Sequence, residues 1–219
     1  MSTTAIKERP ILFSGPMVRA ILDGRKTQTR RIIKGVDSWP CARGCDGGVS
    51  WATPDGRPYP EHGFIKCPYG QPSDRLWVRE KHAFVDSIVD NCEREDPTHV
   101  AFDADKTIWV YERCPHNSKV VPQLLRGNDE FAGYNPKKFN WRPSIYMPRW
   151  ACRLVLHVTA LRVERLQGID PLDCVAEGAD PEVDHAVPKF MDLWESIHGA
   201  GSWEQNPWLW VVEFKRIKP

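Results

Sequence analysis

The sequence lacks a long apolar run of the kind that crosses a membrane. No stretch of its 219 residues approaches the roughly 20 consecutive apolar residues that a membrane-spanning helix needs. Residues 1–10 also lack the apolar core and cleavage site of a secretory signal peptide. We therefore expect a soluble, cytoplasmic protein without a membrane partner.

The sequence also lacks the even number of cysteines that is typical of a disulfide framework. The chain has seven cysteines and no secretory signal, so disulfides are not expected in a reducing compartment. Four cysteines stand alone in the sequence and are interpreted as small buried hydrophobic residues: Cys92, Cys114, Cys152 and Cys174.

The chain has almost no excess of either charge, with 30 Lys and Arg against 29 Asp and Glu. The distribution is nevertheless uneven. Residues 1–34 hold eight basic and two acidic side chains, whereas residues 85–105 hold one basic and seven acidic, and residues 170–195 one basic and eight acidic. Such a distribution is typical of local phosphate binding, and equally of solvated charge scattered over opposite faces.

Short strands outnumber helices in the pattern of apolar residues. Five segments predict strands by alternation or by a short apolar run: 11–13, 27–33, 75–80, 154–165 and 208–217. Three segments predict short helices: 16–22, 170–177 and 189–197. Because no strand–helix–strand unit repeats, we predict an α+β fold, a small mixed β-barrel that forms one domain over residues 1–219.

Two long segments interrupt this pattern and are interpreted as irregular insertions. Residues 35–72 are rich in Gly, Pro and Asp and poor in aliphatic residues. Residues 85–140 combine an acidic first half with a second half rich in Pro, Gly and Asn. Within that second insertion, residues 99–110 are suited to a hairpin.

The clearest chemistry lies in residues 24–31, Gly-Arg-Lys-Thr-Gln-Thr-Arg-Arg. Lys26 stands two residues after a glycine suited to a left-handed turn and three residues before Thr29. Partial burial would lower the pKa of this lysine from about 10.4 towards neutrality, so that it could act as a base beside the threonine hydroxyl. Strand alternation places Thr29 and Arg31 on one face. The alternatives are a basic hairpin that binds phosphate and a solvated turn.

Residues 13–31 resemble the opening of ASCH-domain proteins, a PUA-like family. They are similar to the strand, helix and Gly-Arg-Lys-Thr-x-Thr turn of the small bacterial N(4)-acetylcytidine amidohydrolases. The resemblance resumes at 72–80, at 154–178 with its Ala-Glu-Gly ending, and at 210–214. The whole sequence, including Arg-Pro-Ser-Ile-Tyr-Met-Pro-Arg-Trp at 142–150, is similar to longer ASCH proteins encoded by bacteriophages and prophages, which implies the cytoplasm of a bacterial host.

This resemblance implies an amidohydrolase that removes the acetyl group from N(4)-acetylcytidine or a related modified base. It implies Lys26 as the base, Thr29 as the nucleophile that forms an acyl intermediate, and Glu177 as the proton-transfer residue. The reaction requires no cofactor. Five further residues are candidates for substrate binding: Arg25, Arg30, Arg31, Arg79 and Trp150.

Two of these candidates also have structural interpretations. Arg79 and Glu80 follow Trp77 on a predicted strand, where they would line a cleft or join a cross-strand ion pair. Arg149 and Trp150 resemble a base-stacking pair of nucleic-acid-binding proteins, although a tryptophan that packs beneath a loop gives the same pattern.

A second candidate site, for structural zinc, lies in the first insertion. Its potential ligands are Cys41, Cys45, His62 and Cys67. Three soft ligands and an imidazole in a segment too polar for a core of its own favour a metal. Their spacing is irregular, however, so free or packed cysteines are the alternative.

Three functions follow from these patterns, with a modified nucleoside or RNA as the partner. The first is the amidohydrolase. The second is an RNA- or DNA-binding ASCH module without catalysis, in which the basic turn holds phosphate. The third is a ribonuclease that uses the same lysine and glutamate on a phosphodiester.

Overall fold

The structure is a computed structural model that describes residues 5–34, 40–43, 49–51, 66–85, 99–111, 122–124, 137, 139–179 and 186–217. The helices are α1 (Gly15–Leu22), α2 (Pro171–Ala176) and α3 (Ala186–His198), with 3-10 helices η3 (Ser144–Tyr146), η4 (Arg149–Ala151) and η5 (Leu166–Gly168). The strands are β1 (Glu8–Leu12), β2 (Gln28–Ile32), β3 (Pro40–Arg43), β4 (Val49–Trp51), β5 (Arg75–Arg79), β6 (His82–Val85), β7 (His99–Phe102), β8 (Thr107–Tyr111), β9 (Pro122–Leu124), β10 (Val155–Arg165) and β11 (Trp208–Ile217). The predicted α+β class is confirmed.

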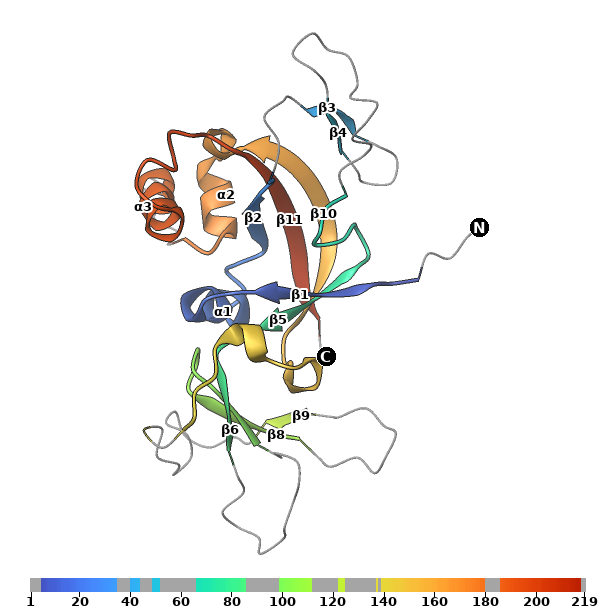
Figure 1. The fold of residues 1–219 in the computed structure, drawn as a ribbon, viewed down its shortest axis with the longest axis vertical. Coiled ribbons are helices and arrows are strands. Elements are labelled where there is room, and N and C mark those ends of the chain that lie inside the picture. The colour runs from blue at the N-terminus through green and yellow to red at the C-terminus, as the bar shows by residue number, and fades with distance from the viewer. Residues whose placement is uncertain are drawn as a thin grey trace, which may run out of the picture. The chain divides into compact units, whose positions relative to one another are not determined.

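The largest sheet has five strands in the order β1-β5-β10-β11-β2 (Figure 1). Strand β11 pairs with β2 in antiparallel register, from Leu209 opposite Ile32 to Glu213 opposite Gln28. Among the described strands, β1 and β2 stand at the two ends of this order, so the sheet is open there and does not close into the predicted barrel.

The chain folds into two compact units. The first unit comprises Met1–Arg9, Ala20–Leu76 and Leu156–Ile217, and the second comprises Pro10–Arg19, Trp77–Val155 and Lys218–Pro219. Each unit is therefore assembled from segments that are far apart in the sequence.

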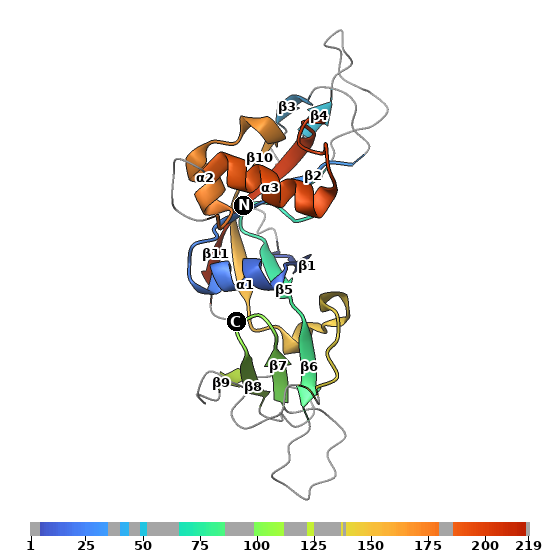
Figure 2. The ribbon, with the colours of Figure 1, turned by 90° about the vertical axis from the view of Figure 1, so that its left-hand side faces the viewer.

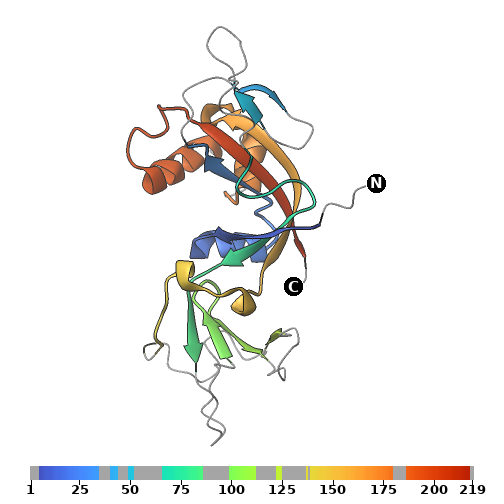
Figure 3. The same ribbon diagram turned by 45° about the vertical axis from the view of Figure 1, so that its right-hand side comes forward.

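In the first unit, helices α2 and α3 pack together against β11, as the views in Figure 1 and Figure 3 agree. Helix α2 begins as predicted, with Asp170 as N-cap: its Oδ1 accepts a hydrogen bond from the Asp173 backbone N at 2.7 Å, and Pro171 fills the first turn. The buried residues of this core are Leu166, Ile169, Cys174, Ala186, Phe190, Trp194 and Leu209. This packing fixes α2 beside the sheet.

The turn after α1 has the predicted left-handed glycine. Gly24 has φ of 75°, a conformation that costs other residues free energy. Past this turn, the backbone N atoms of Arg25 and Lys26 both donate to the Ala20 carbonyl oxygen at 2.9 Å. These bonds hold the start of β2 against the end of α1.

The second unit contains a four-stranded sheet in the order β6-β7-β8-β9, with β6, β7 and β8 side by side in Figure 2. The hairpin predicted for residues 99–110 is confirmed, because β7 and β8 pair in antiparallel register. The prediction that residues 85–140 are irregular is wrong for β7, β8 and β9, which form a sheet with β6. A buried cluster of Ala83, Ala101 and Ile108 explains the sheet, since its apolar residues come from separate short strands.

The first insertion also contains regular structure, where the sequence predicted none. Strands β3 and β4 pair in antiparallel register, with Arg43 opposite Val49. Both strands are too short to show an alternation of apolar and polar residues that would have predicted them. Most of residues 35–72 lie outside the described part of the chain.

Among the described residues, no helix combines the length and the apolar character that crossing a membrane requires.

His82 in the second unit predicts a pH dependence of stability. It is fully buried, its Nδ1 lies 3.2 Å from the Glu80 carbonyl oxygen, and its Nε2 has no partner among the described residues. Burial lowers the pKa of His82 below 6.5; the Glu80 oxygen opposes this shift and the charge of Arg142 adds to it. The unfolded chain therefore takes up this proton at a higher pH than the folded chain.

We expect the free energy of unfolding to be highest above about pH 6.5 and to fall, by up to about 1.4 kcal/mol per pH unit, as the pH drops towards the folded-state pKa. Denaturant unfolding at about pH 7, 6 and 5 measures this slope. His82→Phe removes the titrating group and should flatten it, whereas Lys81→Ala, a neighbouring exposed residue, should leave it unchanged. An equal slope in His82→Phe would contradict the assignment.

Candidate functional site

The site in the first unit is built around an ion pair between Lys26 and Glu177, two residues that are 151 positions apart in the sequence. Lys26 Nζ donates to Glu177 Oε2 at 2.8 Å and to the Glu177 carbonyl oxygen at 2.7 Å. Lys26 is 2% exposed and Glu177 is 8% exposed, so the carboxylate is the member of the pair nearer to solvent. Two of the three predicted catalytic residues are thus in direct contact.

Burial makes the charged form of Lys26 less favourable than it is in water. Burial lowers the pKa of Lys26 from 10.5; Glu177 opposes the shift, and the charges of Arg31 and Arg30 add to it. The predicted lowering of this pKa by burial agrees in direction with this environment. A proton held by Lys26 is therefore easier to release than one on an exposed lysine.

A second cation, Arg30, holds the carboxylates of α2 and its end in place. Its guanidinium donates to Asp173 Oδ2 at 2.7 Å, and more distantly to Glu164 Oε2 at 3.2 Å and Glu177 Oε1 at 3.4 Å. Burial alone would raise the pKa of Asp173, but the charge and hydrogen bond of Arg30 hold it below its usual value. The sequence suggested that Arg30 contacts substrate. In the structure Arg30 is 5% exposed and contacts Glu177, so it positions this carboxylate.

Further polar residues extend this network along β10 and β11. Gln28 Nε2 donates to Asp173 Oδ1 at 3.1 Å, and Arg162 Nη2 donates to the same oxygen at 2.7 Å. Arg162 also contacts the carboxylates of Glu164 and Glu213. The result is an alternation of cations and carboxylates that fixes Asp173, and through it the first turn of α2.

Gln28, Asp173 and Arg162 were not among the residues predicted from the sequence. Two local signals were present. Asp173 and Glu177 are four residues apart, which places both carboxylates on one side of a helical turn. Gln28 and Arg30 are two residues apart on a strand, which places both on one face. In the structure Gln28 and Arg30 both contact Asp173. This shared contact shows that their face of β2 meets the carboxylate side of α2.

Thr29, the predicted nucleophile, is buried at the centre of β2, opposite Val212 of β11. Because Gln28 and Arg30 both point to Asp173, alternation directs Thr29 and Arg31 to the other face of the strand. The predicted common face of Thr29 and Arg31 is therefore confirmed. The same geometry sets the Thr29 side chain apart from that of Arg30.

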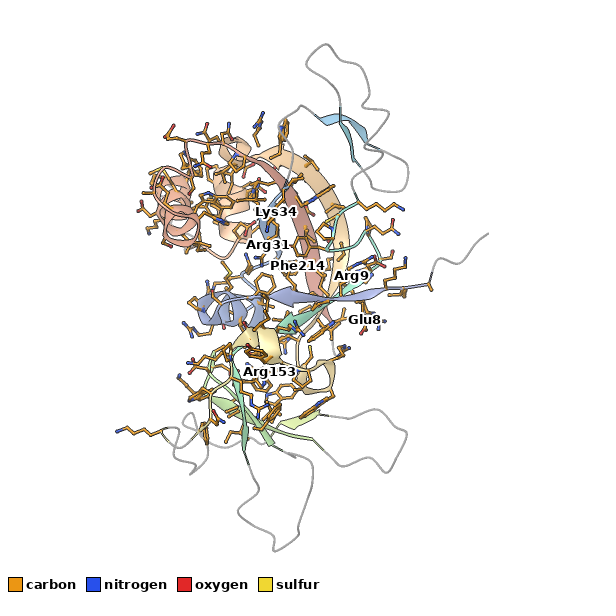
Figure 4. All side chains as sticks on the ribbon, viewed as in Figure 1. Glu8, Arg9, Arg31, Lys34, Arg153 and Phe214 are labelled. Carbon is orange, nitrogen blue, oxygen red and sulfur yellow. The ribbon has the colours of Figure 1, made fainter. Side chains whose placement is uncertain are left out.

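The two flanking arginines occupy different environments. Arg25 is exposed and its Nη2 donates to Asp23 Oδ2 at 2.9 Å. Arg31, labelled in Figure 4, is half-buried, and its guanidinium carbon lies 5.9 Å from the centre of the Tyr69 ring. Of the two, Arg25 is the one that presents its charge to solvent beside the turn.

Gly178 allows α2 to approach Lys26 closely. Its φ is +94°, and a Cβ there would lie 3.0 Å from Ala20 Cβ and 3.2 Å from Lys26 Cβ. Any side chain at this position would push against the stem of Lys26. Gly24 also has a positive φ, but a Cβ there would have no atom within 4 Å.

These two glycines predict a graded loss of stability. Gly24→Ala carries only the cost of the left-handed backbone, about 1–2 kcal/mol. Gly178→Ala carries a similar cost and adds about 1–3 kcal/mol for crowding in a packed core. Chemical denaturation of both variants measures the difference, and equal losses would show that the close approach to Lys26 does not constrain the fold.

The remaining predicted substrate residues, Arg79 and Trp150, lie in the second unit. Arg79 Nε donates to the Met147 carbonyl oxygen at 3.2 Å. Glu80 forms the ion pair that was the structural alternative, with Arg153 at 2.7 Å. Trp150 is 39% exposed and stacks on Phe84, so it is not enclosed beneath a loop.

The zinc prediction falls largely outside the described residues. Cys45 and His62 lie outside them, and Cys41 is described in its backbone alone. Cys67 is a buried free thiol, and burial raises its pKa to about 11, so that zinc binding would have to release its proton. No group of potential metal ligands occurs among the residues the structure describes. Structural zinc stays a prediction.

The isolated cysteines are described in part. Cys152 and Cys174 are buried free thiols, as predicted, and burial raises the pKa of each to about 11. Cys92 and Cys114 lie outside the described residues.

Comparison of the chain with protein-family models, with curated proteins and with solved structures finds no match. The function of the site is therefore inferred from its own residues and from the sequence resemblance that begins at residues 13–31.

Proposed function

We propose that this protein is an amidohydrolase of the ASCH, PUA-like type that removes the acetyl group from N(4)-acetylcytidine or a related modified base. The observation that carries the proposal is the buried contact of 2.8 Å between Lys26 Nζ and Glu177 Oε2, with the pKa of Lys26 lowered by burial. The resemblance implied both residues from separate parts of the sequence. Such a pair is suited to transferring protons at neutral pH.

In the proposed reaction, Lys26 passes a proton to Glu177 within the pair, and its neutral amine then accepts the proton of the Thr29 hydroxyl while Oγ1 attacks the acetyl carbonyl carbon. The tetrahedral intermediate collapses when the C–N bond breaks, and the leaving N4 takes a proton that passes from Lys26 through Glu177. Cytidine leaves and an acetyl ester remains on Thr29. For the second half of the reaction, Lys26 again passes a proton to Glu177 and accepts one from the water that attacks the ester. The Thr29 oxygen then leaves with the proton held by Glu177, and the acetic acid formed is released as acetate with loss of its proton to solvent.

Arg30 and Asp173 have a positioning role in this scheme. Arg30 holds Glu177 Oε1 from one side while Lys26 holds Oε2 from the other, so both carboxylate oxygens have partners. Asp173 in turn binds the Arg30 guanidinium at 2.7 Å. The carboxylate is thereby oriented before the substrate arrives, which reduces the reorganisation that proton transfer requires. Exposed Arg25, beside the same turn, is suited to a phosphate of the substrate.

The test is incubation of the full chain with N(4)-acetylcytidine, as the free nucleoside and within a short RNA, followed by chromatographic detection of cytidine and acetate. We expect stoichiometric release of both products. N(4)-methylcytidine, which has no acyl group, is the matched control and should persist. If no cytidine forms from either substrate at high protein concentration, the amidohydrolase function is excluded; cleavage of the RNA chain instead would indicate a ribonuclease.

A further inference from the structure

Three large apolar side chains are exposed on η3 and η4 of the second unit, in a stretch of the sequence that also contains arginines. On η3 and η4, Ile145 is 55% exposed, Tyr146 is 69% exposed and Trp150 is 39% exposed. Residues 139–152 contain two arginines and no acidic residue. An exposed surface that is both aromatic and positively charged is typical of a binding site rather than of solvated surface.

The aromatic part of this surface is held in a fixed orientation. The rings of Trp150 and Phe84 stack with centroids 5.3 Å apart and an interplanar angle of 19°. The Arg142 guanidinium carbon lies 4.8 Å from the centre of the same Phe84 ring. Backbone hydrogen bonds between His82 and Arg142, of 2.8 and 3.3 Å, fix that arginine beside β6. Phe84 is therefore contacted by both the indole of Trp150 and the guanidinium of Arg142.

Two further arginines gather around a neighbouring tryptophan. The guanidinium carbons of Arg79 and Arg149 lie 4.8 and 6.0 Å from the centre of the Trp77 ring. Arg79 is also held by the Met147 carbonyl oxygen. Two positive charges held near one ring create a local potential that attracts an anion such as a phosphate.

We propose that this aromatic–arginine patch, formed by Phe84, Arg142, Tyr146, Arg149 and Trp150, binds single-stranded nucleic acid. Trp150 and Tyr146 offer ring faces on which bases stack, and the arginines neutralise the backbone phosphates. Bases in a duplex already stack on one another, so only an unpaired strand can use these rings.

The patch lies wholly in the second unit, whereas Lys26 and Glu177 lie in the first. The inference therefore does not rest on the proposed hydrolysis. If both hold, Arg142→Ala and Tyr146→Ala weaken the use of an acetylated RNA and leave the hydrolysis of free N(4)-acetylcytidine unchanged. This comparison distinguishes a failure of the proposed hydrolysis from a failure of the proposed nucleic-acid binding.

The experiment is fluorescence anisotropy with labelled oligouridylate and oligothymidylate of about ten nucleotides, and with a duplex of equal length. Affinity is measured at about 50 and about 200 mM salt, because release of counterions from phosphate makes such binding salt-dependent. We expect the single strands to bind more tightly than the duplex. The ratio between the two single strands shows whether the 2′-hydroxyl of RNA and the methyl group of thymine are together distinguished.

Substitutions assign this binding to the patch. Trp150→Ala should weaken binding about 5- to 100-fold, whereas Trp150→Phe, which keeps a ring, should retain most of the affinity. Arg142→Ala should reduce the salt slope by about one. Arg216→Ala removes the same charge from an exposed position in the first unit and is the matched control.

Tyr146→Ala is expected to fold normally, because that side chain is largely exposed. It should weaken binding without changing the thermal midpoint. The inference is overturned if the protein binds no oligonucleotide at low salt, if the duplex binds as tightly as the single strands, or if the patch variants bind as the Arg216→Ala control does.

Discussion

Lys26→Met and Glu177→Gln are each expected to reduce the hydrolysis of N(4)-acetylcytidine by about 100-fold or more, the range for loss of a general acid or base. Methionine keeps the length of the lysine side chain but cannot carry a proton, and glutamine keeps the shape of the glutamate without its basicity. The measurement is kcat/KM from initial rates of cytidine release. Because the two residues pass the same proton, the double variant should lose no more activity than either single variant.

Stability separates this role from a structural one. Each single change leaves a buried partner without its counter-charge, which costs about 3–5 kcal/mol when no other partner remains and less for Glu177, since Arg30 still contacts it. The double variant replaces the ion pair by neutral groups and should regain part of that stability. If the pair were purely structural, the double variant would regain activity together with stability. That result would contradict a role in proton transfer.

Thr29→Val tests the covalent part of the proposed reaction. Valine keeps the volume of threonine in the buried β2 position but removes the hydroxyl, so acetyl transfer should stop while Thr29→Ser retains activity. Mass spectrometry of rapidly quenched wild-type protein should show an added acetyl group, absent from Thr29→Val. Full activity in Thr29→Val would contradict the acyl intermediate. It would mean that water attacks the acetyl group directly, with Lys26 as the base. The direction of the Thr29 side chain, away from that of Arg30, is compatible with this second route.

Arg153→Met is expected to lower the free energy of unfolding by about 3–5 kcal/mol. Arg153, labelled in Figure 4, is 1% exposed and donates to both oxygens of Glu80, at 2.9 and 2.7 Å. It also donates to Asp105 at 2.7 Å and to Thr107 at 2.7 Å. Removing it leaves the Glu80 carboxylate, which is equally buried, without a counter-charge.

The aromatic residues around Arg153 add to this cost. Its guanidinium carbon lies 4.0 Å from the centre of the Phe102 ring and 5.7 Å from that of Trp109. Burial alone would lower the pKa of Arg153, but Glu80 and Asp105 raise it, so the group stays charged. The cation is thus the centre of the second unit's polar core.

Urea denaturation measures the effect of Arg153→Met. The matched control is Lys81→Ala, which breaks an exposed pair with Asp103 at 3.1 Å and should cost about 0–1 kcal/mol. Arg153→Met combined with Glu80→Gln should be more stable than Arg153→Met alone, because the orphaned charge is removed. Similar losses for Arg153→Met and Lys81→Ala would show that the network contributes little.

Local features of this protein were determined by the sequence alone. The left-handed Gly24, the N-cap Asp170 with Pro171, and the hairpin within residues 99–110 depend on a few neighbouring residues, so their patterns were sufficient. Alternation likewise determined the common face of Thr29 and Arg31. The α+β class followed from the same local periodicities.

Packing between distant segments decided what the turn at residues 24–31 contacts. Periodicity could not show that Glu177 reaches Lys26, nor that Arg30 shares that carboxylate; only the resemblance pointed to Glu177. The sheet inside residues 85–140 was missed because its core is collected from separate short strands. The burial that lowers the pKa of Lys26 comes from α2 and its closing Gly178, which lie about 150 residues away and are brought beside β2 by the apolar packing of α2 and α3 on β11.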